Sequence, residues 1–278
     1  MPSIHTLTLN NHTLTYTAAG SPDAPPLLMV HGWTSYRGVW RQTMEAFQDR
    51  YYCVALDLLG CGHSDKPADA DYSISAQGQR VLQFADALGI DHFTLMGHSM
   101  GGQIALCMAS MLAPERVTNL VSVAGVVAAR LTPFVEENVY RGIALGSRFP
   151  WIYKIGEKLV DFRWYSRFSF RSWFYNMDAI PFDDWEVDRR MAVQPAAYIS
   201  TYKAGEAIHG LNLTPHLAKI TVPILAVAGR QDAVVPVSDS ELIQQHVPNS
   251  RLVWIDECGH FPMYEQTGQY LEALRGFL

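Results

Sequence analysis

Ser99 stands in the run Gly97-His98-Ser99-Met100-Gly101, directly after the largely apolar stretch His92 to Met96. That stretch predicts a buried strand, and the small and apolar residues Gly102 to Ala109 predict a helix packed on the sheet. A serine at a sharp strand-to-helix turn exposes its hydroxyl above the strand ends. Glycines two residues before and after the serine leave room for the strained backbone of such a turn. The pattern therefore predicts a nucleophilic serine.

A base and an orienting acid are available in two later loops. A serine hydroxyl needs both, because it is a poor nucleophile at neutral pH. Asp232 follows the predicted strand Leu225 to Ala228, and His260 follows the predicted strand Leu252 to Ile255. Parallel strands end at one edge of a sheet, so both side chains are expected beside Ser99. The three residues together predict acyl transfer.

Acyl transfer also needs two donors for the charge that develops on the carbonyl oxygen. The main-chain N–H of Met100, next to the serine, is the first candidate. The second is the N–H of Trp33 in the loop His31-Gly32-Trp33, where Gly32 lets the chain turn. We expect the Trp33 side chain to bind substrate. His98 is expected to pack beside the turn and contribute to substrate binding rather than act as the base.

Other polar residues in these loops are interpreted as structural. His31 ends the apolar run Leu27 to Val30 and is expected to support its loop. Asp57 precedes the glycine-rich turn Leu58 to Ser64, which lacks the GxGxxG spacing of a dinucleotide-binding loop. We therefore expect Asp57 to cap that turn from inside.

The elements that position these residues alternate along the chain. Ile4 to Leu9 and Thr13 to Thr17 flank Asn10-Asn11 and predict an antiparallel hairpin. Apolar runs typical of strands buried on both faces then follow at Leu27–Val30, Tyr51–Leu56, 93–96, 117–124, 224–228 and 252–255. Helical patterns lie between them at 38–47, 75–88, 102–112, 238–247 and 266–278. This alternation predicts an α/β fold with a mostly parallel central sheet flanked by helices on both faces.

The alternation stops between about Val126 and Leu213, in a stretch dense in large aromatic residues. We expect residues 1–125 and 214–278 to form the core domain. Residues 126–213 are expected to form a helical cap over the carboxyl ends of the strands, where open α/β sheets bind their ligands.

Composition narrows the class of protein. The 278 residues are 49% hydrophobic and 17% charged, as in a soluble globular protein, and the net charge of −6 gives no reason to expect nucleic acid. The four cysteines form no CxxC pair, and the first residues contain no charged and apolar signal segment. No run of 18 apolar residues appears, so a membrane span is not expected. We expect a cytoplasmic protein that needs no metal or other cofactor.

Five motifs in order resemble the α/β-hydrolase superfamily: His31-Gly32-Trp33, 57–64, 97–102, Gly229-Arg230-Gln231-Asp232 and Gly259-His260-Phe261-Pro262. The order of Ser99, Asp232 and His260 is the nucleophile–acid–base order of that superfamily. Ser99 at the elbow argues against haloalkane dehalogenases and epoxide hydrolases, which are similar in architecture but use an aspartate at this position.

Residues 98–102 are similar to those of serine carboxylesterases and monoacylglycerol-lipase-like enzymes. The resemblance implies hydrolysis of a small-molecule ester with a small to medium apolar acyl or aryl group, through an acyl-enzyme intermediate. Two alternatives use the same triad: a carbon–carbon hydrolase of ring-cleavage diketones, and a perhydrolase. Phe261 differs from the tryptophan often found in the first of these.

Arg163, Arg167 and Arg171 recur every four residues and predict one stripe on a helix, while aromatic residues fill the other faces. The aromatic residues are Phe162, Trp164, Tyr165, Phe168, Trp173 and Phe174. In one interpretation this helix lies on a lipid surface. The interpretation we favour is that the aromatic residues close the substrate pocket and the arginines face water.

Overall fold

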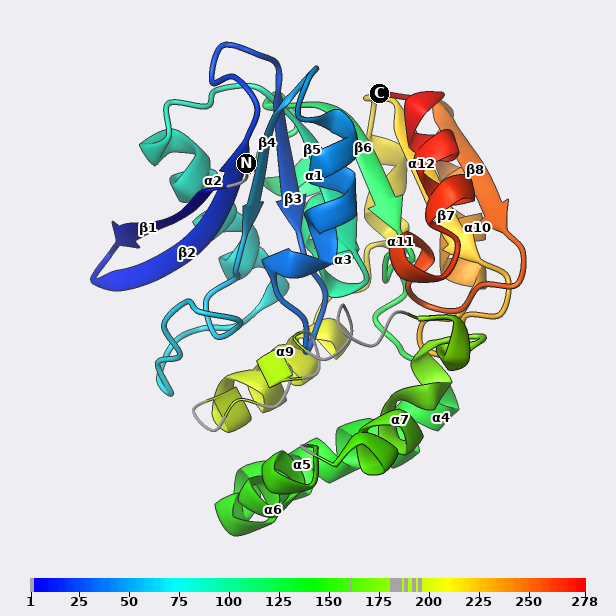
Figure 1. Ribbon diagram of the computed structural model, residues 1–278. Coiled ribbons are helices and arrows are strands. Elements are labelled where there is room, and N and C mark those ends of the chain that lie inside the picture. The colour runs from blue at the N-terminus through cyan, green and yellow to red at the C-terminus, as the bar shows by residue number, and fades with distance from the viewer. Residues whose placement is uncertain (1–2, 161, 181–186, 188–189, 192–193, 195–196) are drawn as a thin grey trace.

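The computed structural model describes residues 3–278 except 161, 181–186, 188–189, 192–193 and 195–196, and is built around an eight-stranded sheet (Figure 1). The strands are β1 (Ser3–Leu9), β2 (His12–Ala19), β3 (Pro26–Val30), β4 (Tyr52–Leu56), β5 (Phe93–His98), β6 (Val117–Val123), β7 (Ile224–Gly229) and β8 (Ser250–Ile255). Their order in the sheet is β1-β2-β4-β3-β5-β6-β7-β8. Strands β3 to β8 pair in parallel, and β1 and β2 are antiparallel. The predicted fold class is confirmed.

The local sequence accounts for both kinds of pairing. Asn10 and Asn11 have φ angles of 49° and 65°, as the two central residues of a tight hairpin turn require. Every residue of β5 and β7 is buried, because helices cover both faces of the parallel strands. Five of the six apolar runs therefore correspond to interior strands, whereas the run 252–255 lies in the edge strand β8, whose residues are mostly half-buried.

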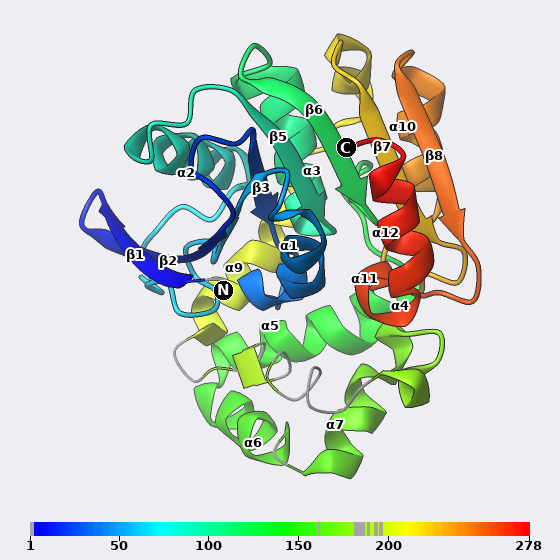
Figure 2. The ribbon, with the colours of Figure 1, turned by 45° about the horizontal axis from the view of Figure 1, so that its top comes forward.

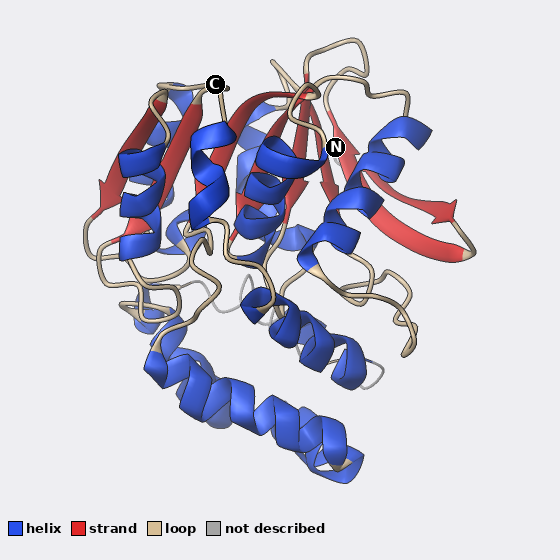
Figure 3. Cartoon of the chain, turned by 180° about the vertical axis from the view of Figure 1, so that it is seen from behind, coloured by secondary structure: helices blue, strands red, loops and turns tan. Residues whose placement is uncertain are grey.

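Helices cover the sheet on both sides. Helices α1 (Arg41–Phe47) and α12 (Thr267–Arg275) share one face, where the hydroxyls of Thr43 and Tyr270 are hydrogen-bonded over 2.8 Å. Helices α2 (Ile74–Ala87), α3 (Met100–Cys107) and α10 (Ser238–His246) lie on the other face, as the view from behind shows (Figure 3). Helix α3 begins at Met100, two residues earlier than predicted, because the chain turns into the helix directly after Ser99.

The described part of the helical segment, residues 126–213, lies at the carboxyl ends of the parallel strands (Figure 2). Its α-helices in the described part are α4 (Pro133–Val135), α5 (Arg141–Arg148), α6 (Pro150–Val160), α7 (Arg163–Phe170) and α9 (Tyr198–His209). Helix α9 contacts both α2 and α5, and so joins the helical segment to the core. None of the helices among the described residues has the length and apolar character needed to cross a membrane.

Candidate active site

Ser99 occupies the turn between β5 and α3 with φ 56° and ψ −118°. A residue with a side chain rarely adopts a positive φ, and holding it there costs about 1–3 kcal/mol, which the surrounding structure must offset. The backbone on both sides is fixed: the N–H of Ser99 donates to the carbonyl of Val123, and its carbonyl accepts from Gln103 and Val126. Ser99 is 5% exposed. The predicted strained elbow is present.

The two glycines that flank the elbow have no room for a side chain. A Cβ at Gly97 would lie 2.2 Å from the carbonyl oxygen of Gly101. A Cβ at Gly101 would lie 2.1 Å from the carbonyl oxygen of Val30, at the end of β3. Such distances are far below van der Waals contact, so close packing of α3 on β5 and β3 requires glycine at both positions.

Asp232 and His260 meet as predicted, in the loops after β7 and β8. The Nδ1–H of His260 donates to Oδ2 of Asp232 over 2.8 Å, and the two side chains are 1% and 2% exposed. The other carboxylate oxygen of Asp232 accepts from the N–H groups of Val234 and Val235, at 2.7 and 3.0 Å. The carboxylate is thereby held in one orientation. With the proton on Nδ1, the Nε2 of His260 is left as a proton acceptor.

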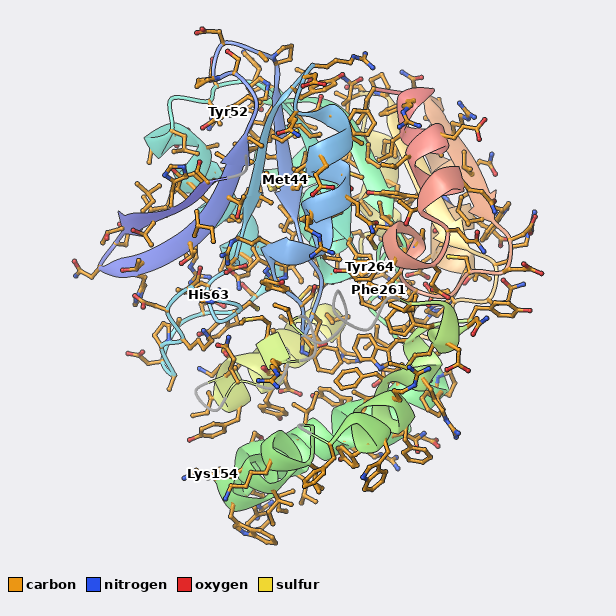
Figure 4. The ribbon with its side chains drawn as sticks, viewed as in Figure 1. Met44, Tyr52, His63, Lys154, Phe261 and Tyr264 are labelled. Carbon is orange, nitrogen blue, oxygen red and sulfur yellow. The ribbon has the colours of Figure 1, made fainter. Side chains whose placement is uncertain are left out.

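The loop that carries His260 is fixed by two residues that the sequence did not single out for this role. The N–H of His260 donates to the main-chain carbonyl of Trp173 over 2.9 Å. The carboxylate of Glu265 accepts from Gly259 N–H at 2.9 Å and from Tyr175 N–H at 2.6 Å. These bonds join the His260 loop to the helical segment. Figure 4 shows Phe261 and Tyr264, the loop's next aromatic residues, between the sheet and that segment.

His98 is buried beside the elbow and contacts His260 rather than solvent. Its Nε2–H donates to the main-chain carbonyl of His260 over 2.9 Å, and the two ring centres are 4.7 Å apart. The pKa of His98 lies well below its ordinary value, mainly because the ring is buried and also because His260 is close. The ring is therefore neutral. Its Nδ1 has no hydrogen-bond partner within the described part of the chain. With 1% exposure, His98 packs beside the elbow as predicted.

The two segments that carry the predicted N–H donors, the start of α3 and the β3 loop, both approach Ser99. Met100 is the first residue of α3, so its N–H has no acceptor within the helix. The β3 loop approaches from the other side: a Cβ at Gly32 would lie 2.9 Å from the Cβ of Ser99. Trp33 follows Gly32, and its indole N–H donates to the carbonyl of Thr201 in α9 over 2.8 Å. The Trp33 side chain is 4% exposed, and its hydrogen bond to Thr201 connects the β3 loop to the helical segment.

His31 and Asp57 have the structural contacts expected of them. Nε2 of His31 accepts from the N–H of Leu58 at 3.0 Å, and its Nδ1–H donates to Gly32 at 2.8 Å. Burial lowers the pKa of His31. The carboxylate of Asp57 accepts from the N–H groups of Arg37 and His63 and forms an ion pair with the Arg37 guanidinium. Arg37 was not predicted to take part.

The aromatic residues of the helical segment divide into two groups. Trp173 and Phe174 are both 5% exposed, and their rings stack on Phe261 with centres 6.1 and 5.2 Å away. The expectation that the aromatic residues point inward is met by these two. It is wrong for Phe162, Trp164 and Phe168, which are 56%, 68% and 60% exposed. Trp164 and Phe168 are four residues apart, so they share one face of α7, and that face is in solvent.

The arginine stripe is only partly solvent-facing. Arg167 forms an ion pair with Asp178, and the guanidinium of Arg171 lies 4.6 Å from the centre of the Phe168 ring. The side chain of Arg163 lies outside the part that the structure describes.

Comparisons with known proteins agree with this architecture. The model of the alpha/beta hydrolase fold family matches residues 25–267. A crystal structure of a membrane phospholipase A, a bacterial virulence factor, is 31% identical, with a TM-score of 0.78 over 99% of this chain and 86% of that one. Pimeloyl-[acyl-carrier protein] methyl ester esterase from Nitrosomonas europaea is 27% identical over 98% of both chains. The 3-oxoadipate enol-lactonase 2 from Acinetobacter baylyi is 26% identical over 100% of this chain and 98% of that protein.

Proposed function

This chain belongs to the family of proteins with the alpha/beta hydrolase fold, and on that premise we propose that it is a serine hydrolase of carboxylic esters. The observation that carries the proposal is the buried Asp232–His260 hydrogen bond at the same sheet edge as the strained Ser99. A serine, a histidine and an aspartate in this arrangement are the groups that acyl transfer requires.

In the proposed mechanism, Ser99 Oγ attacks the ester carbonyl while Nε2 of His260 takes the hydroxyl proton. The Asp232 carboxylate holds the ring in the required tautomer and stabilises the imidazolium that forms. The N–H groups of Met100 and Trp33 donate to the oxyanion of the tetrahedral intermediate. His260 then returns the proton to the departing alcohol, which leaves an acyl group on Ser99. Water activated by the same histidine releases the acid.

Ester cleavage is favoured by the chemistry of the relatives. The esterase, the enol-lactonase and the phospholipase are all named for cleavage of an acyl–oxygen bond. A serine at the elbow suits that chemistry, because it gives an acyl-enzyme that water can hydrolyse.

We infer an apolar acyl or aryl group of small to medium size. Support comes from the aromatic rings nearest the base: the ring centres of Trp173 and Phe261 lie 6.3 and 5.3 Å from that of His260. Apolar surroundings favour an apolar acyl group and lower the local dielectric, which strengthens the triad's interactions. Residues 126–213 would then act as the cap that sets acyl length. The unpaired thiols of all four cysteines support a reducing compartment such as the cytoplasm.

The test is hydrolysis of p-nitrophenyl esters of increasing acyl length by the wild type and by Ser99→Ala. We expect Ser99→Ala to lower kcat by about 10⁴- to 10⁶-fold, as removal of a triad nucleophile does. The matched control is Ser21→Ala, which removes a hydroxyl from an exposed loop. A fluorophosphonate should label the wild type and the control but not Ser99→Ala. Equal ester hydrolysis by the wild type and Ser99→Ala would refute the proposal. Faster turnover of a vinylogous diketone than of any ester would replace it with carbon–carbon hydrolysis.

A further inference from the structure

The outer layer, defined as α5 to α7 with residues 141–171, concentrates the exposed apolar side chains of the described molecule. Seven of the twelve exposed large hydrophobic residues of the described chain lie in the outer layer: Leu145, Phe149, Trp151, Ile155, Phe162, Trp164 and Phe168. Their exposed fractions run from 42% for Phe149 to 68% for Trp164. Single exposed hydrophobic residues are ordinary on protein surfaces, but a concentration of this kind marks an interaction site.

Helical spacing groups these side chains. Trp151 and Ile155 are four residues apart on α6, as Trp164 and Phe168 are on α7, so each pair lies on one helix face. Helix α6 contacts both α5 and α7, which makes the layer continuous. Figures 1 and 2 both show this layer on the far side of α9 from the sheet. The exposed pairs therefore belong to the part of the protein farthest from its core.

The outer layer carries a net positive charge, whereas the rest of the chain carries a net negative charge. Residues 141–171 hold seven of the 21 lysines and arginines but two of the 27 aspartates and glutamates, in a chain of net charge −6. Lys154 and Lys158 are exposed on α6 beside the Trp151–Ile155 pair, and Figure 4 places Lys154 on the outer layer. The guanidinium of Arg171 covers the Phe168 ring, and that of Arg148 lies 5.9 Å from the Phe149 ring. The charge of Arg167 is neutralised by Asp178.

We propose that the outer layer docks on an anionic lipid surface. Tryptophan and phenylalanine insert at the boundary between headgroups and acyl chains, while lysine and arginine bind acidic headgroups. The charge separation in this chain favours that surface, because the layer is positive while the remaining residues carry a net negative charge. A second copy docking through the same patch is disfavoured, since a two-fold contact would bring identical positive surfaces together. The proposal does not depend on the catalytic residues.

The test is flotation of the full-length protein with vesicles of phosphatidylcholine alone or mixed with phosphatidylglycerol. We expect at least about tenfold more protein on the mixed vesicles, and a loss of that excess at high ionic strength. Lys154→Glu/Lys158→Glu should lower binding by about tenfold or more. The matched control, Lys219→Glu/Arg275→Glu, makes the same charge change at exposed positions outside the layer and should bind like the wild type.

A second pair of variants tests the apolar component. Trp164→Ser/Phe168→Ser should also lose vesicle binding, whereas Ile4→Ser/Met111→Ser, which alters exposed hydrophobic residues elsewhere, should keep it. Circular dichroism and unfolding curves show that each variant is folded. Failure of the wild type to bind mixed vesicles overturns the proposal, as does equal loss in either control. If light scattering shows a wild-type dimer that only the layer variants dissociate, and vesicles bind neither form, the occupant is a second copy and the proposal is wrong.

Discussion

The imidazole of His98 donates a hydrogen bond to the main-chain carbonyl of His260, over 2.9 Å. One residue of the elbow thus holds the backbone of the residue proposed as the base. The bond is buried, and the neutral state of His98 keeps its donor in place without adding a charge beside His260. Together with Trp173 and Asp232, it gives His260 three separate attachments.

His98→Ala should therefore lower kcat by about 10- to 100-fold with little change in KM, because a base displaced by a fraction of an ångström reacts poorly. His98→Gln retains an N–H donor of similar reach and should restore part of the rate. Steady-state kinetics on one p-nitrophenyl ester checks both. A rise in KM at constant kcat would instead assign His98 to substrate binding.

Gly32→Ala should impair catalysis by crowding the elbow. The new methyl group would lie 2.9 Å from the Cβ of Ser99 and 3.1 Å from Nδ1 of His98. Neither neighbour is the end of a flexible chain, so the β3 loop and its Trp33 N–H must move. We expect kcat to fall by about 100-fold or more, as for the loss of one oxyanion donor. Gly142→Ala, with open space around its Cβ position, is the control and should keep full activity.

Glu265→Ala should lower the free energy of unfolding by about 2 kcal/mol, because it leaves the N–H groups of Gly259 and Tyr175 without their carboxylate acceptor. Urea unfolding curves measure the change, and kcat should fall as well because Gly259 adjoins His260. Glu272→Ala removes an exposed carboxylate from α12 and serves as the control. Equal stability of the two variants would show that Glu265 does not fix the loop.

The stability of the protein should decrease in mild acid. Burial holds the pKa values of His31 and His98 below the ordinary value of 6.5, so below that pH the unfolded chain binds protons that the folded chain does not. The stability that each neutral ring contributes is fully present above pH 6.5. As the pH falls below that value, each ring lowers the free energy of unfolding by up to about 1.4 kcal/mol per pH unit. Urea unfolding from about pH 8 to about pH 5 measures how the free energy of unfolding changes with pH. His98→Gln should reduce that slope by the contribution of one proton. A wild-type stability that stays constant through this interval would contradict the prediction.

The sequence was sufficient to predict the sheet and the meeting of Asp232 with His260. Both follow from apolar runs that end in short loops, because parallel strands bring their carboxyl ends to one edge. The contact of Trp173 with His260 could not be predicted in the same way. It is made by the main-chain carbonyl of Trp173, a group that every residue type has. Glu265 looks like any exposed helical acid in the sequence. Only the folded loop shows that its carboxylate is surrounded by N–H groups.

The expectation that Trp164 and Phe168 point toward the pocket is wrong, because both side chains are exposed. Their spacing predicts that they share a helix face, which is correct, but spacing does not show which face contacts the protein. Large aromatic residues are usually buried, and that general tendency favoured the wrong side. Trp173 and Phe174 follow the tendency because they pack on Phe261.

The indole of Trp33 binds α9 through Thr201, while the residue before it, Gly32, borders the elbow. This single residue makes the helical segment a poor module for exchange between related proteins. A segment transplanted from a relative would have to offer a carbonyl at the position of Thr201 as well as a complementary surface. With the helical segment as the proposed cap, directed changes of acyl preference are therefore expected to succeed more often as point substitutions within the segment than as replacements of it.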